Sequence, residues 1–220
     1  MDALAPRYAP ARDFARFVLA AATLFACLST FALAQQASAP VALPQPAIAA
    51  GPRVALETSQ GRIVVELYPD KAPRTVANFL AYVRDGHYNG TIFHRVIGDL
   101  LVQGGGYTPD MEYKPERAPV PGEANNGLSN LRGTLAAARR PSDKDSARAQ
   151  FFINTVDNRQ FDFRSDQSPQ QAGYCVFGRV VEGLEVVDKI RVVATTARPP
   201  LAGDVPVTPV VVERAMVLPQ

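Results

Sequence analysis

Short strand-like runs, separated by bends rich in glycine and proline, dominate the chain after residue 53. The clearest run is Thr91–Ile97, and Gln103 with the glycine run 104–106 follows it closely. Glycines beside a strand let the backbone bend tightly. Alternating apolar residues also predict a hairpin over Arg53–Leu67. Further strands are predicted at Leu100–Gln103, Thr134–Ala138, Phe151–Asn154, Tyr174–Val181 and Val210–Leu218.

Only two helical patterns interrupt these runs. Pro73 suits a first helical turn, Val76, Phe79, Leu80 and Val83 follow at helical spacing, and Gly86 ends the pattern. A shorter helix is predicted over Leu184–Ile190. This balance favours a mainly β fold, a closed antiparallel barrel of about eight strands capped by two helices, with a sandwich as the alternative. Helices that do not alternate with strands disfavour a parallel α/β fold.

Residues 1–34 have the pattern of a secretory signal peptide. Arg7, Arg12 and Arg16 precede the uncharged apolar run 17–31, and Ala32-Leu33-Ala34 fits a cleavage site. That run is short for a membrane span. We therefore expect cleavage after Ala34, a periplasmic mature protein and no stable membrane insertion. A retained anchor, or a lipid anchor on Cys27, is the alternative.

Residues 35–52 are uncharged and rich in Ala, Pro and Gln, which predicts a flexible tether before one domain over 53–220. Cleavage of the signal would leave Cys175 as the single cysteine, so no disulfide is expected within the mature chain. Its apolar neighbours favour a buried core residue over a reactive thiol.

Charge and motifs exclude several function classes. A net charge of +2 gives no reason to expect nucleic acid or an acidic membrane surface as a partner. With only His87 and His94, a histidine-rich metal site is excluded. The glycine run is neither a P-loop nor a dinucleotide fingerprint, and no nucleophile elbow is present. We predict no metal and no cofactor.

Arg95 lies inside the Thr91–Ile97 run. Strict alternation predicts Phe93 and Arg95 on one face of the strand, with His94 and Val96 on the other. We expect His94 to face away from any groove and to be hydrogen-bonded within the barrel. A lone arginine on a strand is usually a solvated charge, so the strand pattern alone assigns Arg95 no function.

Several blocks, in the same order, resemble the cyclophilins, the barrel-type peptidyl-prolyl cis-trans isomerases, and most closely their exported bacterial branch. The resemblance covers about residues 53–218. It rests on Ala72–Phe79, Phe93–Ile97, Val102–Gly106, Gln150–Asn154, Gly173–Gly178 and Val180–Gly183.

The resemblance implies a role for each matching position. Arg95 corresponds to the catalytic arginine and Gln103 to a glutamine that contacts substrate. Phe152 corresponds to the floor of the proline pocket. Its walls correspond to Leu101, Leu100 and Phe161, and Tyr174 matches a substrate-binding position often held by histidine or tyrosine. Ala138 and Arg139 fall where the family offers backbone donors and acceptors.

The implied function is isomerisation of X-Pro bonds in exported proteins as they fold, by a monomer acting on unfolded or proline-containing polypeptides. Leu100 and Gln160 stand where relatives carry aromatic residues, Asp99 adds a charge, and residues 164–171 form an insertion. We therefore expect at most weak binding of cyclosporin-like ligands. One alternative is a proline-peptide-binding chaperone with weak or no isomerase activity, and another is a tethered envelope scaffold.

Overall fold

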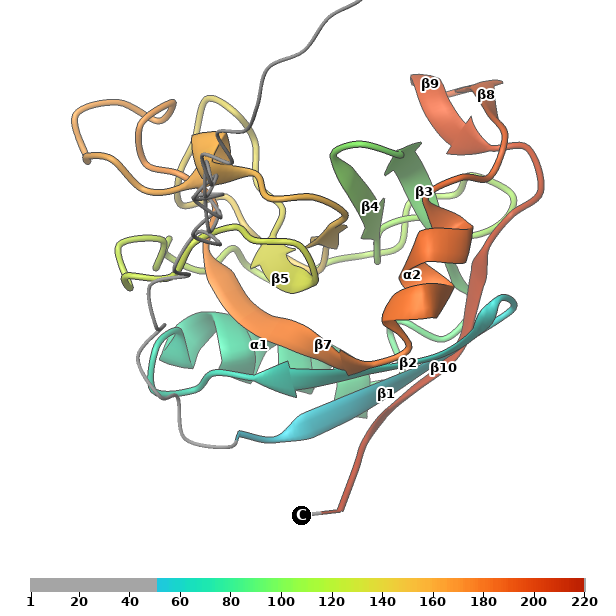
Figure 1. The fold of residues 1–220 in the computed structure, drawn as a ribbon, viewed down its shortest axis with the longest axis horizontal. Helices are drawn as coiled ribbons and strands as arrows, with labels where there is room; N and C mark the ends of the chain where they lie inside the picture. Colours follow the sequence, from blue (N-terminus) through green and yellow to red (C-terminus); the bar gives the residue numbers. More distant parts are fainter. Residues whose placement is uncertain (1–50, 220) are drawn as a thin grey trace, which may run out of the picture. The chain divides into compact units, whose positions relative to one another are not determined.

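The computed structural model describes residues 51–219, in which eight antiparallel strands close into a barrel (Figure 1). Around the barrel the strand order is β1-β10-β3-β4-β6-β5-β7-β2. The fold class predicted from the sequence is confirmed. The strands are β1 (Arg53–Thr58), β2 (Gly61–Leu67), β3 (Thr91–Ile97), β4 (Leu101–Gly104), β5 (Thr134–Ala137), β6 (Phe151–Asn154), β7 (Val176–Glu182) and β10 (Val211–Val217).

Two helices pack on the barrel, α1 (Pro73–Arg84) and α2 (Leu184–Ile190). Proline opens α1 as predicted, and the apolar face of this helix is buried. Its Phe79 packs edge-on against Phe151 at 5.4 Å between ring centroids. Val186 of α2 lies so close to Gly61 that a Cβ there would be 2.9 Å from it. Gly61 therefore permits the close approach of α2 to β2.

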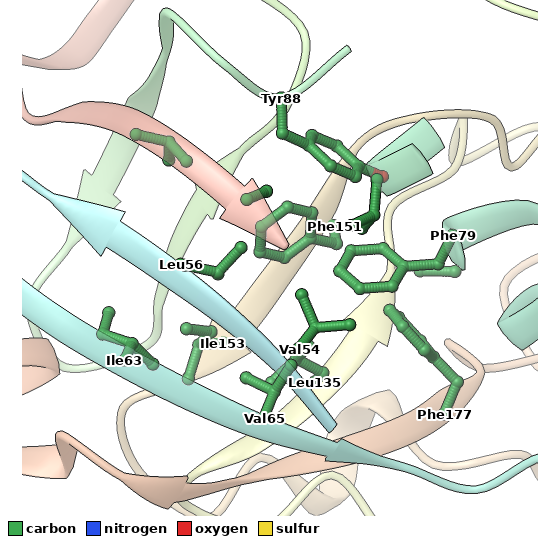
Figure 2. Close-up of a cluster of buried hydrophobic side chains, with 14 of the residues drawn as sticks. Val54, Leu56, Ile63, Val65, Phe79, Tyr88, Leu135, Phe151, Ile153 and Phe177 are labelled. Atoms are coloured by element: carbon green, nitrogen blue, oxygen red, sulfur yellow. The ribbon is translucent and has the colours of Figure 1, made fainter. Parts of the chain in front are cut away.

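The barrel interior is a continuous apolar core (Figure 2). All eight barrel strands contribute inward-facing side chains, and both helices and Tyr88 add further apolar side chains to the cluster. Cys175 belongs to this core, as predicted, and burial raises the pKa of its thiol to about 12. A thiol held protonated in this way is a weak nucleophile.

One two-stranded sheet outside the barrel is absent from the sequence-based prediction. It pairs β8 (Thr195–Arg198) with β9 (Leu201–Pro206). Most of β8 is exposed, so its residues show no apolar alternation from which a strand could be predicted. A short 3₁₀ turn, Arg159–Phe161, was also missed. The predicted signal peptide, nearly all of the predicted tether and Cys27 lie outside the described residues.

Candidate active site

A row of side chains crosses the outer face of four adjacent strands. Arg95 on β3 pairs with Gln103 on β4, Gln103 pairs with Phe152 on β6, and Phe152 pairs with Ala136 on β5. Residues directly opposite each other across strands share a face of the sheet. The pairing therefore places a guanidinium, an amide and an aromatic ring side by side.

A β-bulge at His94 sets the direction of Arg95. The register shifts between Phe93, which pairs with Gly104, and Arg95, which pairs with Gln103. Phe93 and Val96 both lie in the barrel core, whereas Arg95 is exposed. The prediction that Phe93 and Arg95 share a face is therefore wrong. An extra residue in one strand interrupts the alternation and redirects the side chain that follows.

His94 is buried behind this bulge, with 2% of its surface exposed. Its ring packs against that of Tyr107 at 4.8 Å between centroids. The Nδ1 atom has no hydrogen-bond partner among residues 51–219, and hydrogen bonding of the other ring nitrogen within the barrel stays a prediction. Burial lowers the pKa of His94 to about 4, so the ring is neutral near pH 7. As predicted, it does not line the groove described next.

The outer row opens into a groove with a volume of about 380 Å³. All nine residues to which the family resemblance assigned a role line this groove. Pro141 lines it as well, and the sequence analysis missed this residue. The nine are Arg95, Leu100, Leu101, Gln103, Ala138, Arg139, Phe152, Phe161 and Tyr174. The fold thus gathers side chains from four separate segments of the chain into one site.

The apolar wall of the groove consists of Phe152, Phe161, Tyr174, Leu101 and Leu100. Phe152 is buried and meets Phe161 edge-on at 5.9 Å and Tyr174 at 5.5 Å between ring centroids. The Phe161 and Tyr174 rings are 5.1 Å apart. The three rings line the groove together, and an apolar lining of this kind suits a compact saturated ring.

The polar wall consists of Arg95 and Gln103. The Arg95 side chain is 44% exposed, and its Nε lies 3.4 Å from Oδ2 of Asp204. The Gln103 amide Nε2 donates to Oε1 of Gln150 at 2.9 Å. Within residues 51–219, neither terminal nitrogen of Arg95 nor the side-chain oxygen of Gln103 has a hydrogen-bond partner. Both groups are therefore available to a ligand.

Comparison with known proteins identifies the family of this chain. Residues 53–217 match the family model of the cyclophilin type peptidyl-prolyl cis-trans isomerases. Peptidyl-prolyl cis-trans isomerase cyp18 of Streptomyces antibioticus is 56% identical over 165 residues, which cover 75% of this chain and 98% of the relative. Peptidyl-prolyl cis-trans isomerase B of Escherichia coli is 52% identical, over 74% of this chain and 98% of the relative. This chain belongs to the cyclophilin family.

The fold agrees with that assignment. A crystal structure of a cyclophilin type peptidyl-prolyl cis-trans isomerase from Cryptosporidium parvum superposes with a TM-score of 0.61 at 21% identity, covering 77% of this chain and 98% of the other. The chain is thus an isomerase that rotates the peptide bond preceding proline. The functional assignment rests on the family model and the close relatives, and the structural likeness supports the fold.

A network of buried amides fixes the apolar wall of this cyclophilin from behind. Asn158 Nδ2 donates to the carbonyl of Leu100 at 2.7 Å and to Oδ1 of Asn154 at 2.8 Å. Asn154 in turn donates to Asn130, whose side chain donates to the carbonyl of Phe161 at 3.2 Å. The network therefore connects the two ends of the wall.

Gln160 is part of this network. Its Nε2 donates to Oδ1 of Asn158 at 3.0 Å, and it does not line the groove. The sequence analysis noted Gln160 as a departure from the family because relatives carry an aromatic residue there. In this cyclophilin the position instead supports Asn158, which in turn holds Leu100. The pattern of side chains in the sequence gave no signal for this network.

The side chain of Arg139 makes several contacts beside the groove. Its Nε donates to the carbonyl of Gly173 at 2.9 Å and its Nη2 to that of Pro169 at 2.7 Å. The guanidinium carbon lies 4.6 Å from the centre of the Tyr174 ring. The resemblance implied only a backbone role here. In the structure, Arg139 ties the 164–171 insertion to the apolar wall, while the backbone N–H of neighbouring Ala138 donates to Gln150.

No group of three or more metal-ligating side chains occurs within residues 51–219. In the same part of the chain, no helix has both the length and the apolar character that a membrane crossing requires.

Proposed function

We propose that Arg95 is the catalytic residue of this isomerase and that the apolar wall holds the substrate proline. The supporting observation is the row that sets Arg95 and Gln103 beside Phe152 across three paired strands. A related Cryptosporidium parvum cyclophilin has been crystallised in the presence of the dipeptide Ala-Pro. By analogy, the proline ring of a client would rest on Phe152, and the bond preceding it would lie toward Arg95.

The chemistry needs only a positioned donor. Rotation about an amide bond has a barrier of about 18–20 kcal/mol because the C–N bond is partly double. As the bond twists, the lone pair on nitrogen localises and becomes able to accept a hydrogen bond. A guanidinium aimed at that nitrogen binds the twisted state more tightly than the planar one, which lowers the barrier. Arginine suits this role because it stays charged at all relevant pH values.

The required effect is moderate. Uncatalysed isomerisation takes tens of seconds, and a reduction to milliseconds needs about 6 kcal/mol at roughly 1.4 kcal/mol per tenfold. Gln103 would contribute by orienting a neighbouring carbonyl, and the aromatic wall by fixing one side of the rotating bond. Together these contacts share the required stabilisation among several groups.

The test is an isomerase assay on an X-Pro peptide with the wild-type protein and Arg95→Ala. The side chain is exposed, so the variant should remain folded while kcat/KM falls by about 100-fold or more, the scale of losing one preorganised donor. Arg62→Ala is the matched control, since Arg62 is another exposed, carboxylate-paired arginine, located on β2 away from the groove. An Arg95→Ala enzyme with wild-type kcat/KM would refute the proposed mechanism.

We also propose that the mature protein is a periplasmic monomer that assists the folding of exported proteins. The N-terminal sequence supports this: basic residues, an uncharged apolar run and an A-x-A site. In an expressing bacterium, the periplasmic fraction should contain protein that begins at Gln35. A protein retained in the membrane fraction with lipid on Cys27 would contradict the proposal, and light scattering on the purified protein would test the monomer.

The proposed ligands are unfolded or proline-containing polypeptides and, weakly, cyclosporin-like molecules. Gln160 motivates the low affinity, because relatives carry an aromatic ring at this position, whereas here the side chain donates to Asn158 and does not line the groove. Gln160→Trp should therefore bind cyclosporin more tightly than wild type in a calorimetric titration. Equal affinity in the two proteins would remove the basis for this expectation.

A further inference from the structure

Asp204 on β9 is the residue whose side chain contacts the Arg95 guanidinium. Its Oδ2 lies 3.4 Å from Arg95 Nε, although the two residues are 109 positions apart in the chain. Asp204 is not among the residues that line the groove. Its backbone has φ = 62°, in the left-handed region that few non-glycine residues adopt. The contact therefore joins the groove to a segment outside the barrel.

The position of Asp204 is fixed by its neighbour. Val205 is fully buried in a small apolar cluster with Ile92 of β3, and Leu201 of β9 packs against the same cluster. β9 contacts β3, and the β8–β9 hairpin lies beside that strand in Figure 1. Because Ile92 and Arg95 belong to one strand, the cluster sets the distance between Asp204 and the guanidinium. The hairpin thus carries a carboxylate at a defined place.

The pair has little to offer as a stabilising contact. Both side chains are nearly half exposed, at 44% for Arg95 and 45% for Asp204. Exposed ion pairs contribute little to folding stability because water screens them, and a positive φ at a non-glycine residue is itself unfavourable. The contact has a larger effect on the direction of the guanidinium than on stability, because an arginine side chain without such a contact samples many rotamers.

We propose that Asp204 is a positioning residue for Arg95. The carboxylate accepts from Nε and leaves Nη1 and Nη2 for the peptide bond that rotates. Because these nitrogens belong to one planar group, a contact at Nε limits the directions in which the other two can point. Preorganisation of this kind acts in the transition state without touching the substrate. The inference rests on the catalytic role proposed above for Arg95.

The test begins with Asp204→Asn, which removes the charge but keeps a residue that tolerates positive φ. We expect kcat to fall about twofold to fivefold with KM unchanged, because the contact acts on the rotating state and not on proline binding. Asp204→Gly, which keeps the backbone conformation and removes the side chain, should lose at least as much. The matched control is Glu57→Gln on β1. Glu57 forms another partly exposed ion pair, in which its carboxylate lies 3.5 Å from Arg62, and the substitution removes its charge. It should leave kcat unchanged.

A double-mutant cycle separates this inference from the proposal on which it rests. If Arg95→Ala leaves the rate intact, the proposed function itself fails. If Arg95→Ala is inactive but Asp204→Gly, which has no side-chain acceptor for Nε, has wild-type kcat, Arg95 is catalytic and Asp204 does not position it. In an Arg95→Ala background, the further loss from Asp204→Asn should vanish. An equal loss in both backgrounds would mean that the hairpin acts on the groove by another route and would overturn the inference.

Discussion

On one side of the groove, Phe152 is buried and braced by two further rings, and a chain of buried amides holds Leu100 and Phe161 from behind. On the other side, Arg95 is nearly half exposed, and within residues 51–219 its guanidinium has one hydrogen-bond partner, Asp204, at 3.4 Å. β4 contributes to both walls, through Leu101 on the apolar side and Gln103 on the polar side. The wall that would hold proline is thus part of the packed frame, whereas the wall that would act on the peptide bond is attached to its surface.

This difference predicts how the two walls respond to change. Buried side chains contribute to stability through packing, so altering the apolar wall should affect folding and binding together. Exposed side chains contribute little to stability, so altering the polar wall should change the rate alone. The predictions below measure folding, turnover or both, and they run from the largest expected free-energy effect to the smallest.

Phe152→Ala should have the largest effect on stability. Removing a buried aromatic ring costs about 3–5 kcal/mol through lost transfer energy and the cavity left behind. The proline site would lose its floor at the same time, so KM should rise as well. Denaturant unfolding and steady-state kinetics measure the two effects. A fully stable but inactive variant would show that the ring serves only the groove and would break the comparison.

Acid should weaken the fold beneath the polar wall through His94. Burial lowers the pKa of this ring to about 4, below the value near 6.5 expected in the unfolded chain. The unfolded state therefore binds the proton first as the pH falls. The stabilisation is complete above pH 6.5 and is lost between pH 6.5 and 4, by up to about 3 kcal/mol. His94→Phe should flatten this part of the pH profile in denaturant unfolding. An unchanged profile would assign the acid sensitivity to other groups.

Asn158→Ala tests the support of the apolar wall. The substitution removes the side-chain donor to the fully buried Oδ1 of Asn154 and one of the two donors to the Leu100 carbonyl. An unsatisfied buried polar group costs about 1–3 kcal/mol. We expect a lower unfolding midpoint and a higher KM. Asn78→Ala is the control, because Asn78 also donates to a carbonyl, that of Arg148, at 2.7 Å but does not line the groove. If both variants changed KM equally, the network would have no special tie to the groove.

The sequence predicted the regular parts of this molecule well. β3 and α2 have the predicted bounds, because Thr91–Ile97 and Leu184–Ile190 carry clear apolar periods. The groove residues were found through several blocks matched to one family, and no local pattern would have selected them. Their roles remain predictions, while their meeting in one groove is a structural fact.

The sequence did not predict the features that interrupt a regular alternation of side chains or that join segments far apart in the chain. The bulge at His94 inserts one residue, and a strict alternation of two cannot represent it. Asp204 lies beside Arg95 because its neighbour Val205 is buried against Ile92 of β3, although the two segments are far apart in the sequence. The side-chain bonds of Arg139 to two carbonyls likewise arise only once the 164–171 insertion folds back. Tertiary contacts decide all three.

Gln103→Ala should show the smallest free-energy effect and the cleanest separation. Gln103 is partly exposed and donates to Gln150, and both residues line a second pocket that shares Gln103 with the groove. We expect kcat/KM to fall about tenfold, or roughly 1.4 kcal/mol of transition-state stabilisation. Stability should change by less than about 1 kcal/mol, since the lost hydrogen bond joins two groups that water can reach. If Gln103→Ala instead lowered the unfolding midpoint as much as Asn158→Ala, the polar wall would belong to the packed frame, and the contrast between the two walls would not hold.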